Sequence, residues 1–165
     1  MIARVGQLLA RSIEVTVGLI FWLILVLSLL EVISRYFTGY SLVWVVESNR
    51  FLFIWLVFLA AAVCFYRRLH FRVVLLARAL PPALRGKLEV GIDLVSLAFA
   101  AILFVQSLHI VSRTSVQRSP ALLIPMSYVY LVVPLSAALI IVFILMHWVE
   151  ALVAWRLAVP IPDGH

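Results

Sequence analysis

The sequence predicts an all-α membrane protein, organised as a single four-helix transmembrane domain over residues 1–165. Hydrophobic residues make up 66% of the chain and charged residues 12%, whereas a soluble domain is about half apolar and about a quarter charged. Four apolar stretches are each long enough to cross a bilayer core of about 30 Å. We expect these spans at about 13–33, 42–66, 90–111 and 128–149. Spans and connections use almost every residue, so no separate catalytic domain is expected within the chain.

The first span, Ile13–Ile33, follows two arginines and superficially resembles a signal peptide. It is too long for the apolar region of a signal peptide, which has about 7–15 residues, so we expect it to be retained. Charged residues mark both of its ends. Arg11 and Glu14 can pair at its start, and Glu31 and Arg35 have the i,i+4 spacing of a helical ion pair at its end.

The second span, 42–66, carries charged and aromatic residues in its first turns. Helical spacing places Trp44, Glu47 and Trp55 on one face, with Arg50 on its flank. Charges inside an apolar span are costly unless they are paired, and such residues usually face protein rather than lipid. This pattern predicts a helix that contacts a partner.

The connection between the second and third spans is strongly basic, because six of the thirteen basic residues lie within 67–87. Arginines alternate with apolar residues over 70–80, a pattern that favours an interfacial amphipathic helix in contact with membrane lipids. Pro81 and Pro82 are expected to end that helix and to begin the next, since proline is tolerated in a first helical turn. Farther along, Pro134 should kink the fourth span.

The distribution of basic residues predicts that both termini are cytoplasmic. Nine basic residues lie in the terminal segments and the 67–87 connection, and four lie in the segments on the other side. The formal net charge of +6 is therefore expected at the membrane surface, and we expect no nucleic-acid partner.

The predicted topology places Glu31, Arg35, Glu47 and Arg50 in one outer layer. We interpret these four residues as a charge cluster that ties the first two spans together; contact with a partner protein and direct substrate binding remain as alternatives.

The histidines raise a second hypothesis. His70 and His147 are expected near the cytoplasmic face and His109 near the outer face. Two facing histidines could hold a b-type haem, as in a membrane anchor subunit of an oxidoreductase. Histidines at the membrane interface fit their marginal positions better. The sequence has no nucleophile constellation, phosphate-binding loop or metal-ligand cluster, so we predict neither an enzyme nor a cofactor.

Read in order, the residues discussed above resemble a known family. The chain is similar to the DctQ-like small membrane subunit of tripartite ATP-independent periplasmic (TRAP) transporters over nearly its whole length. The resemblance is carried by Arg35-Tyr36, Trp44-Val-Val-Glu47-Ser-Asn-Arg50, Phe53-Ile-Trp55, His70-Phe-Arg-Val-Val-Leu-Leu76, Ser119-Pro-Ala-Leu-Leu-Ile-Pro125 and Pro134-Leu-Ser136. The family often has glycine at Ala60 and Leu123, an acid at Val74 and an aromatic residue at Ser127. We interpret these four as packing or surface positions.

The resemblance implies a multi-pass protein of the bacterial inner membrane, with no catalytic role. Such a subunit accompanies a large multi-span subunit, which holds the substrate and sodium sites, and a periplasmic binding protein that delivers the substrate. It looks like a scaffold in an ion-gradient-driven symporter for a small carboxylate, such as a dicarboxylate or a sugar acid. The residues that select the substrate then belong to another polypeptide. On this interpretation Glu31, Arg35, Trp44, Glu47, Arg50, Trp55 and His70 are structural or interface residues.

Overall fold

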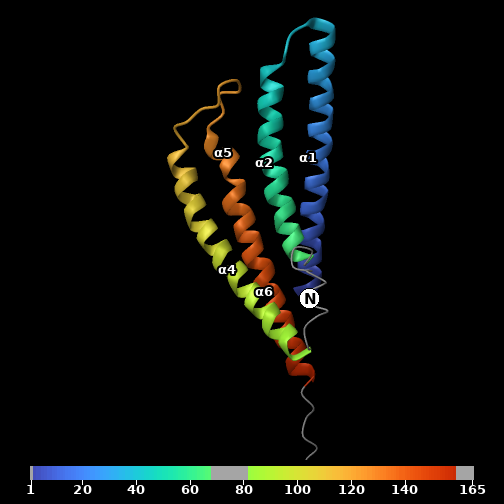
Figure 1. Ribbon diagram of the computed structural model, residues 1–165, viewed down its shortest axis with the longest axis vertical. Helices are drawn as coiled ribbons and strands as arrows, with labels where there is room; N and C mark the ends of the chain where they lie inside the picture. The colour runs from blue at the N-terminus through green and yellow to red at the C-terminus, as the bar shows by residue number, and fades with distance from the viewer. Residues whose placement is uncertain (1, 68–81, 159–165) are drawn as a thin grey trace, which may run out of the picture.

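The computed structural model describes residues 2–67 and 82–158, with side chains for 6–67 and 90–150. Its helices are α1 (Ile2–Thr38), α2 (Val43–Tyr66), α4 (Pro82–Arg113), α5 (Met126–Tyr130) and α6 (Val132–Ala158) (Figure 1). Within the described residues, four helical stretches are long and apolar enough to cross a membrane: Gly6–Thr38, Val43–Tyr66, Val90–Arg113 and Met126–Glu150. The prediction of an all-α, four-span membrane protein is confirmed.

The helices extend beyond the predicted apolar spans. Helix α1 includes the polar residues on both sides of 13–33, and α4 begins at Pro82, eight residues before the predicted span. Hydropathy identifies only the apolar part of a helix that can lie in the membrane. Arginine, glutamine and glutamate are good helix formers, so the helix can continue beyond that part. The start at Pro82 confirms the helix boundary predicted from the two prolines. The interfacial helix predicted over 70–80 lies outside the described residues.

The helices pack in a row rather than around a common axis. Helix α1 packs on α2, α2 on α6 and α6 on α4, with a smaller contact between α1 and α6 (Figure 1). Helices α2 and α6 are the inner members of the row, and the Met126–Glu150 stretch of α5 and α6 is the more buried, with 44% of its spanning window buried against 17% for α2 and none for α1. We call the end with the 39–42 and 114–125 connections the loop end. Both ends of the described chain lie at the opposite, terminal end (Figure 1).

The core lies along α6 where α2 and α4 approach it. Ala62 of α2 and Ala100 of α4 are completely or almost completely buried against Ile140 and Ile144 of α6. Small residues at such contacts let the helix backbones come close, which maximises packing where apolar side chains gain nothing by leaving lipid. A polar contact joins α4 and α6 farther along: the indole Nε1 of Trp148 donates a hydrogen bond to Asp93 Oδ2 at 3.1 Å.

The fourth span is interrupted where its proline predicts a disturbance. Helix α5 ends at Tyr130 and α6 begins at Val132, so Leu131 separates them. Pro134 has no N–H to donate to the carbonyl four residues earlier, which is that of Tyr130.

The C-terminal end of α1 is closed by a glycine. Gly39 has a φ of +72° and donates its N–H to the Arg35 carbonyl at 3.1 Å, which closes the end of α1.

Candidate functional site

The 114–125 connection at the loop end folds into a compact turn over residues 119–124. The Ser119 N–H donates to the Ile124 carbonyl at 2.9 Å, and the Leu123 N–H donates to the Ser119 carbonyl at 3.2 Å. The Met126 N–H donates to the Gln117 carbonyl at 2.9 Å and fixes the entry into α5. Ser119 is almost completely buried at the base of the turn. The turn therefore has a defined backbone shape.

A carboxylate from α2 binds the tip of this turn. Glu47 Oε2 accepts hydrogen bonds from the backbone N–H groups of Ala121 and Leu122, both at 2.9 Å. Glu47 is buried, with 8% of its surface exposed. Successive N–H groups in a turn form a small anion-binding concavity, and hydrogen bonds to an ionised acceptor are among the stronger ones in proteins. We call this arrangement, the Glu47 carboxylate on the N–H groups of Ala121 and Leu122, the loop clamp.

The loop clamp gives the Glu47 side of the Trp44–Trp55 face of α2 a partner within the chain. That face was predicted to meet a partner, but Glu47 and Phe51 are buried within the chain itself. Trp44 is 44% exposed and Trp55 is half-buried, so the face points outward only at its margins. Sequence reasoning missed the acceptor site because backbone N–H groups leave no side-chain signal. Its only trace in the sequence is the turn-prone pair Ser119-Pro120.

Leu123 holds an unusual backbone conformation in the same turn. Its φ is +54°, the left-handed region that favours glycine. Its side chain is 62% exposed, and its carbonyl accepts a hydrogen bond from Arg118 Nη1 at 3.3 Å. Glycine, which the resemblance described above leads one to expect at this position, would adopt this backbone conformation without strain. Leu123 is a surface position, as interpreted, and its positive φ adds a backbone constraint that the interpretation did not include.

Replacing Leu123 by glycine is expected to stabilise the protein by about 0.5–1 kcal/mol. Glycine removes the steric cost of about 1–2 kcal/mol that an L-residue pays in this region, and part of this gain is lost to the greater freedom of glycine in the unfolded chain. Thermal unfolding of the purified chain in detergent would show a midpoint higher by about 2 °C. Leu122→Gly is the matched control, because residue 122 has no positive φ, and it is expected to lower the midpoint. A lower midpoint for Leu123→Gly would contradict the strain.

The expected cluster of Glu31, Arg35, Glu47 and Arg50 is not formed. Glu31 pairs with Arg35 on its own helix at 2.5 Å, and Ser41 Oγ donates to Glu31 Oε1 at 3.2 Å, which fastens the 39–42 connection. Glu47 is occupied by the turn. Within the part of the chain that the structure describes, Arg50 forms no ion pair, and its Cζ lies 5.7 Å from the ring centre of the neighbouring Phe51. The prediction of one charge cluster is wrong, because Glu31 and Arg35 pair with each other while Glu47 binds the turn and lies apart from that pair.

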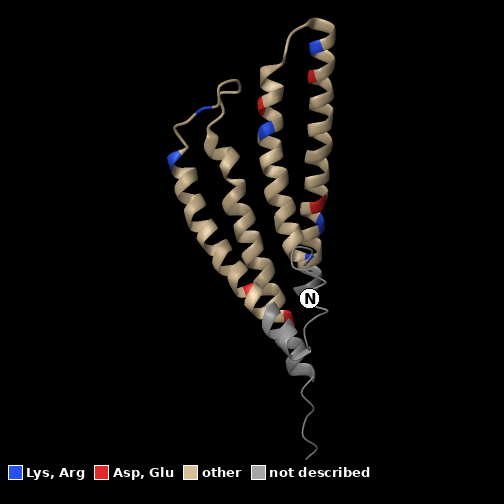
Figure 2. Ribbon diagram, in the orientation of Figure 1, with Lys and Arg blue, Asp and Glu red and all other residues tan. Residues whose placement is uncertain are grey.

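Arg50 belongs to an exposed face of α2. Val46, Phe53 and Val57 are exposed with it, at the four- and three-residue steps of a helical face. Arg50 lies beside the Trp44–Trp55 face, as predicted. Its side chain is exposed, whereas the side chain of Glu47 is buried within the chain. Figure 2 shows the two oppositely charged residues one turn apart on α2.

The first two helices are joined by polar contacts at other depths. Asn49 Nδ2 donates to Ser28 Oγ at 3.0 Å. Near the terminal end, Arg67 forms a two-pronged ion pair with Glu14, Nε to Oε1 at 2.5 Å and Nη2 to Oε2 at 2.7 Å. Hydrogen bonding to the Glu14 carboxylate and its negative charge raise the pKa of Arg67 above its usual value. The predicted pairing of Glu14 with Arg11 is wrong, because the guanidinium of Arg67, the residue that follows α2, reaches both carboxylate oxygens at once.

The histidines are not brought together in the described part of the chain. His109 is exposed in the half of α4 near the loop end, and His147 is half-buried in α6 near the terminal end. His70 lies outside the described residues. Among the described residues, no group of three or more histidine, cysteine or acidic side chains could hold a metal ion. The haem hypothesis depends on His70 and gains no support from these positions.

Comparison with known proteins gives two findings. The sequence model of the family described as "Tripartite ATP-independent periplasmic transporters, DctQ component" matches residues 10–154. The isethionate TRAP transporter permease protein DctMQ of Oleidesulfovibrio alaskensis is 36% identical to the chain over 105 residues. This match covers 62% of the chain and only 16% of the relative, so the chain is similar to a small part of a much longer protein.

Proposed function

The chain belongs to the DctQ component family of TRAP transporters, and from this membership we propose that it is the non-catalytic scaffold subunit of a secondary transporter. The observation that carries the proposal is the family match over residues 10–154, which includes the last three spans and all but the first four residues of the first. The family consists of transporter components, and the chain is a multi-pass membrane protein. Its proposed task is to support a larger membrane subunit that moves the substrate.

The internal contacts support a static role. The loop clamp joins α2 to the connection between α4 and α5. The pair of Glu14 and Arg67 joins the opposite end of α2 to α1. A helix fixed at both ends by charge-assisted hydrogen bonds is better suited to bracing a neighbour than to sliding past one. Helix α2, which carries the exposed Arg50, is therefore a rigid platform in this proposal.

The proposed partners are a large multi-span membrane subunit and a periplasmic substrate-binding protein, in the inner membrane of a bacterium with both termini cytoplasmic. The proposed cargo is a small carboxylate, imported with an ion gradient as the driving force. The name of the relative from Oleidesulfovibrio alaskensis gives isethionate, which is a small organic anion but a sulfonate. This supports the class of small organic anions, and the choice within it is assigned to the partner subunits.

The proposal is tested by isolating the tagged chain from its native membranes in mild detergent and identifying co-purifying proteins by mass. We expect a stoichiometric large multi-span membrane protein. Uptake of a radiolabelled organic anion should then require that partner, and liposomes that contain this chain alone should show none. Recovery of the chain without a membrane partner, or uptake by the chain alone, would contradict the scaffold role.

A further inference from the structure

A cavity opens between the terminal ends of α2 and α6, far from the loop clamp. Its volume is about 240 Å³, and its walls are formed by Phe65, Tyr66, Phe143, Ile144, Met146, His147 and Glu150. Because a water molecule occupies about 30 Å³ in the liquid, the space holds roughly eight waters or one small polar group. Three of the seven wall residues are aromatic, and the acid and the histidine belong to α6 at i,i+3 spacing.

The aromatic part of this cavity is fixed by close packing. The rings of Tyr66 and Phe143 lie 4.9 Å apart with a 48° tilt. Helix α1 approaches the same wall at Gly6, where an added Cβ would lie 3.0 Å from the Met146 methyl and 3.2 Å from the Tyr66 ring. A glycine at this position thus lets α1 press Tyr66 and Met146 into place. The rings form part of a built wall rather than a loose surface.

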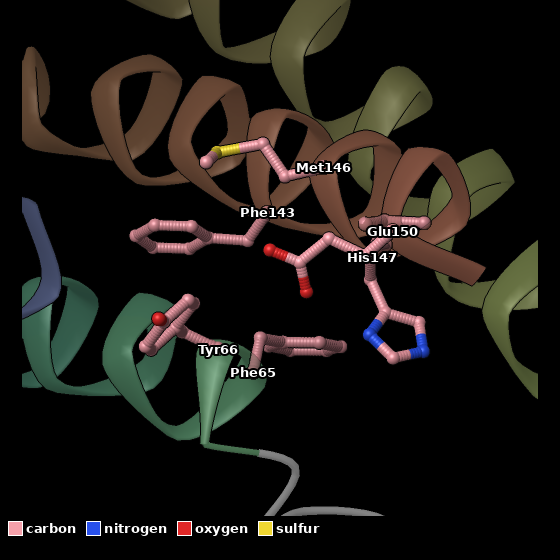
Figure 3. A pocket seen from close by; sticks show the side chains of 7 residues that line it. Phe65, Tyr66, Phe143, Met146, His147 and Glu150 are labelled. Carbon is pink, nitrogen blue, oxygen red and sulfur yellow. The ribbon is translucent and has the colours of Figure 1, made fainter. Parts of the chain in front are cut away.

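The acid in this cavity, Glu150, is exposed and has no counter-ion among the described residues. Figure 3 shows the Glu150 carboxylate directed into the space between the rings of Phe143 and Phe65, with the His147 imidazole beside it. Within the described residues Glu150 forms no ion pair, and the nearby Arg67 is already held by Glu14. A carboxylate aimed between aromatic faces is a suitable site for a cation. The carboxylate supplies the opposite charge, and the negative ring faces attract the same cation.

We propose that this cavity binds a primary alkylammonium group, such as the amine of an ethanolamine phospholipid headgroup or of a small soluble amine. The ammonium donates hydrogen bonds to the Glu150 carboxylate and the Tyr66 hydroxyl, with the rings of Phe65 and Phe143 around its methylene groups. A quaternary ammonium fits less well because it has no N–H to give the carboxylate. An anionic group is repelled by Glu150. The position at the ends of two membrane helices makes a lipid headgroup accessible to the cavity.

The test uses the methyl signal of Met146, a wall residue, in the full chain labelled with ¹³C-methyl methionine in detergent micelles. Met126, at the loop end, serves as the internal reference. The probes are ethanolamine and short-chain phosphatidylethanolamine, phosphatidylcholine and phosphatidylglycerol with two six-carbon acyl chains. We expect phosphatidylethanolamine to shift the Met146 signal saturably and to leave Met126 in place. Saturation by ethanolamine at equal affinity would identify a soluble amine as the ligand, and weaker or no binding of ethanolamine would identify the lipid.

Substitutions at Glu150 decide whether the carboxylate carries the binding. Glu150→Gln is expected to weaken binding of the amine probe by about tenfold or more, because it removes the charge and keeps the shape. Glu150→Asp keeps the charge and should stay within a few-fold of the native affinity. Glu31→Gln, an acid of the loop end, is the matched control and should change nothing. An unmoved Met146 signal, equal shifts with phosphatidylcholine, or native affinity in Glu150→Gln would overturn the proposal.

Discussion

Replacing Glu47 by leucine is expected to release the 119–124 turn and to cost the protein about 2 kcal/mol of stability. The side chain would lose the two 2.9 Å hydrogen bonds from Ala121 and Leu122 and leave both N–H groups without their acceptor. A buried donor without a partner costs about 1–3 kcal/mol. The total falls below the sum for two because Ala121 is exposed and its N–H can reach water once the turn opens.

Hydrogen exchange at the amides of Ala121 and Leu122 measures this release directly. An opening easier by about 2 kcal/mol corresponds to exchange faster by roughly thirtyfold. Glu47→Gln should have a smaller effect, because its amide oxygen can still accept both hydrogen bonds but without the charge. Glu31→Gln alters an acid at the same end of the molecule and should leave these two amides unchanged. Unchanged exchange in Glu47→Leu would show that the turn keeps its shape without the clamp.

The parts of the fold that were predictable from the sequence depend on neighbours along the chain. Apolar length revealed the four spans, a proline located the interruption before α6, and i,i+4 spacing gave the pair of Glu31 and Arg35. The ion pair and the effect of the proline are decided within one or two helical turns, and each span within one continuous stretch of sequence. They follow from the cost of polar groups in lipid and from helix geometry, which act on any sequence in the same way.

The parts that were missed depend on where distant segments meet. Glu47 binds N–H groups more than seventy residues farther along the chain, and Glu14 pairs with Arg67 instead of a residue of its own helix. In a helix that is apolar on all sides, hydropathy gives no sign of which face meets which neighbour. The order of helices in the row, and therefore the inward direction of Glu47, could not be derived from composition or spacing.

Glu47 and Arg50, the two charged residues of the Trp44–Arg50 motif, have different roles. The acid holds the protein's own turn, while the base lies one turn deeper on an exposed apolar face beside Phe53 and Val57. Arg50 is seven residues into α2, about 10 Å below the start of the helix. A charge at the centre of a membrane costs at least about 2.5 kcal/mol, and less nearer its surface. A hydrogen-bond acceptor on a neighbouring membrane subunit would remove much of that cost.

Replacing Arg50 by leucine is therefore expected to impair assembly with the large membrane subunit and to leave the chain itself intact. We expect the amount of co-purified partner to fall by about tenfold, while thermal unfolding of the isolated variant stays at or above the native midpoint, because Arg50 forms no ion pair within the described residues. Arg50→Lys should give an intermediate yield, since lysine keeps the charge but lacks the planar fork of donors. Val46→Leu, on the same face, is the neutral control. Native partner yield in Arg50→Leu would mean that this arginine reaches lipid headgroups instead, and the assigned contacts of the Trp44–Arg50 motif would then all lie within the chain, through Glu47 and Asn49.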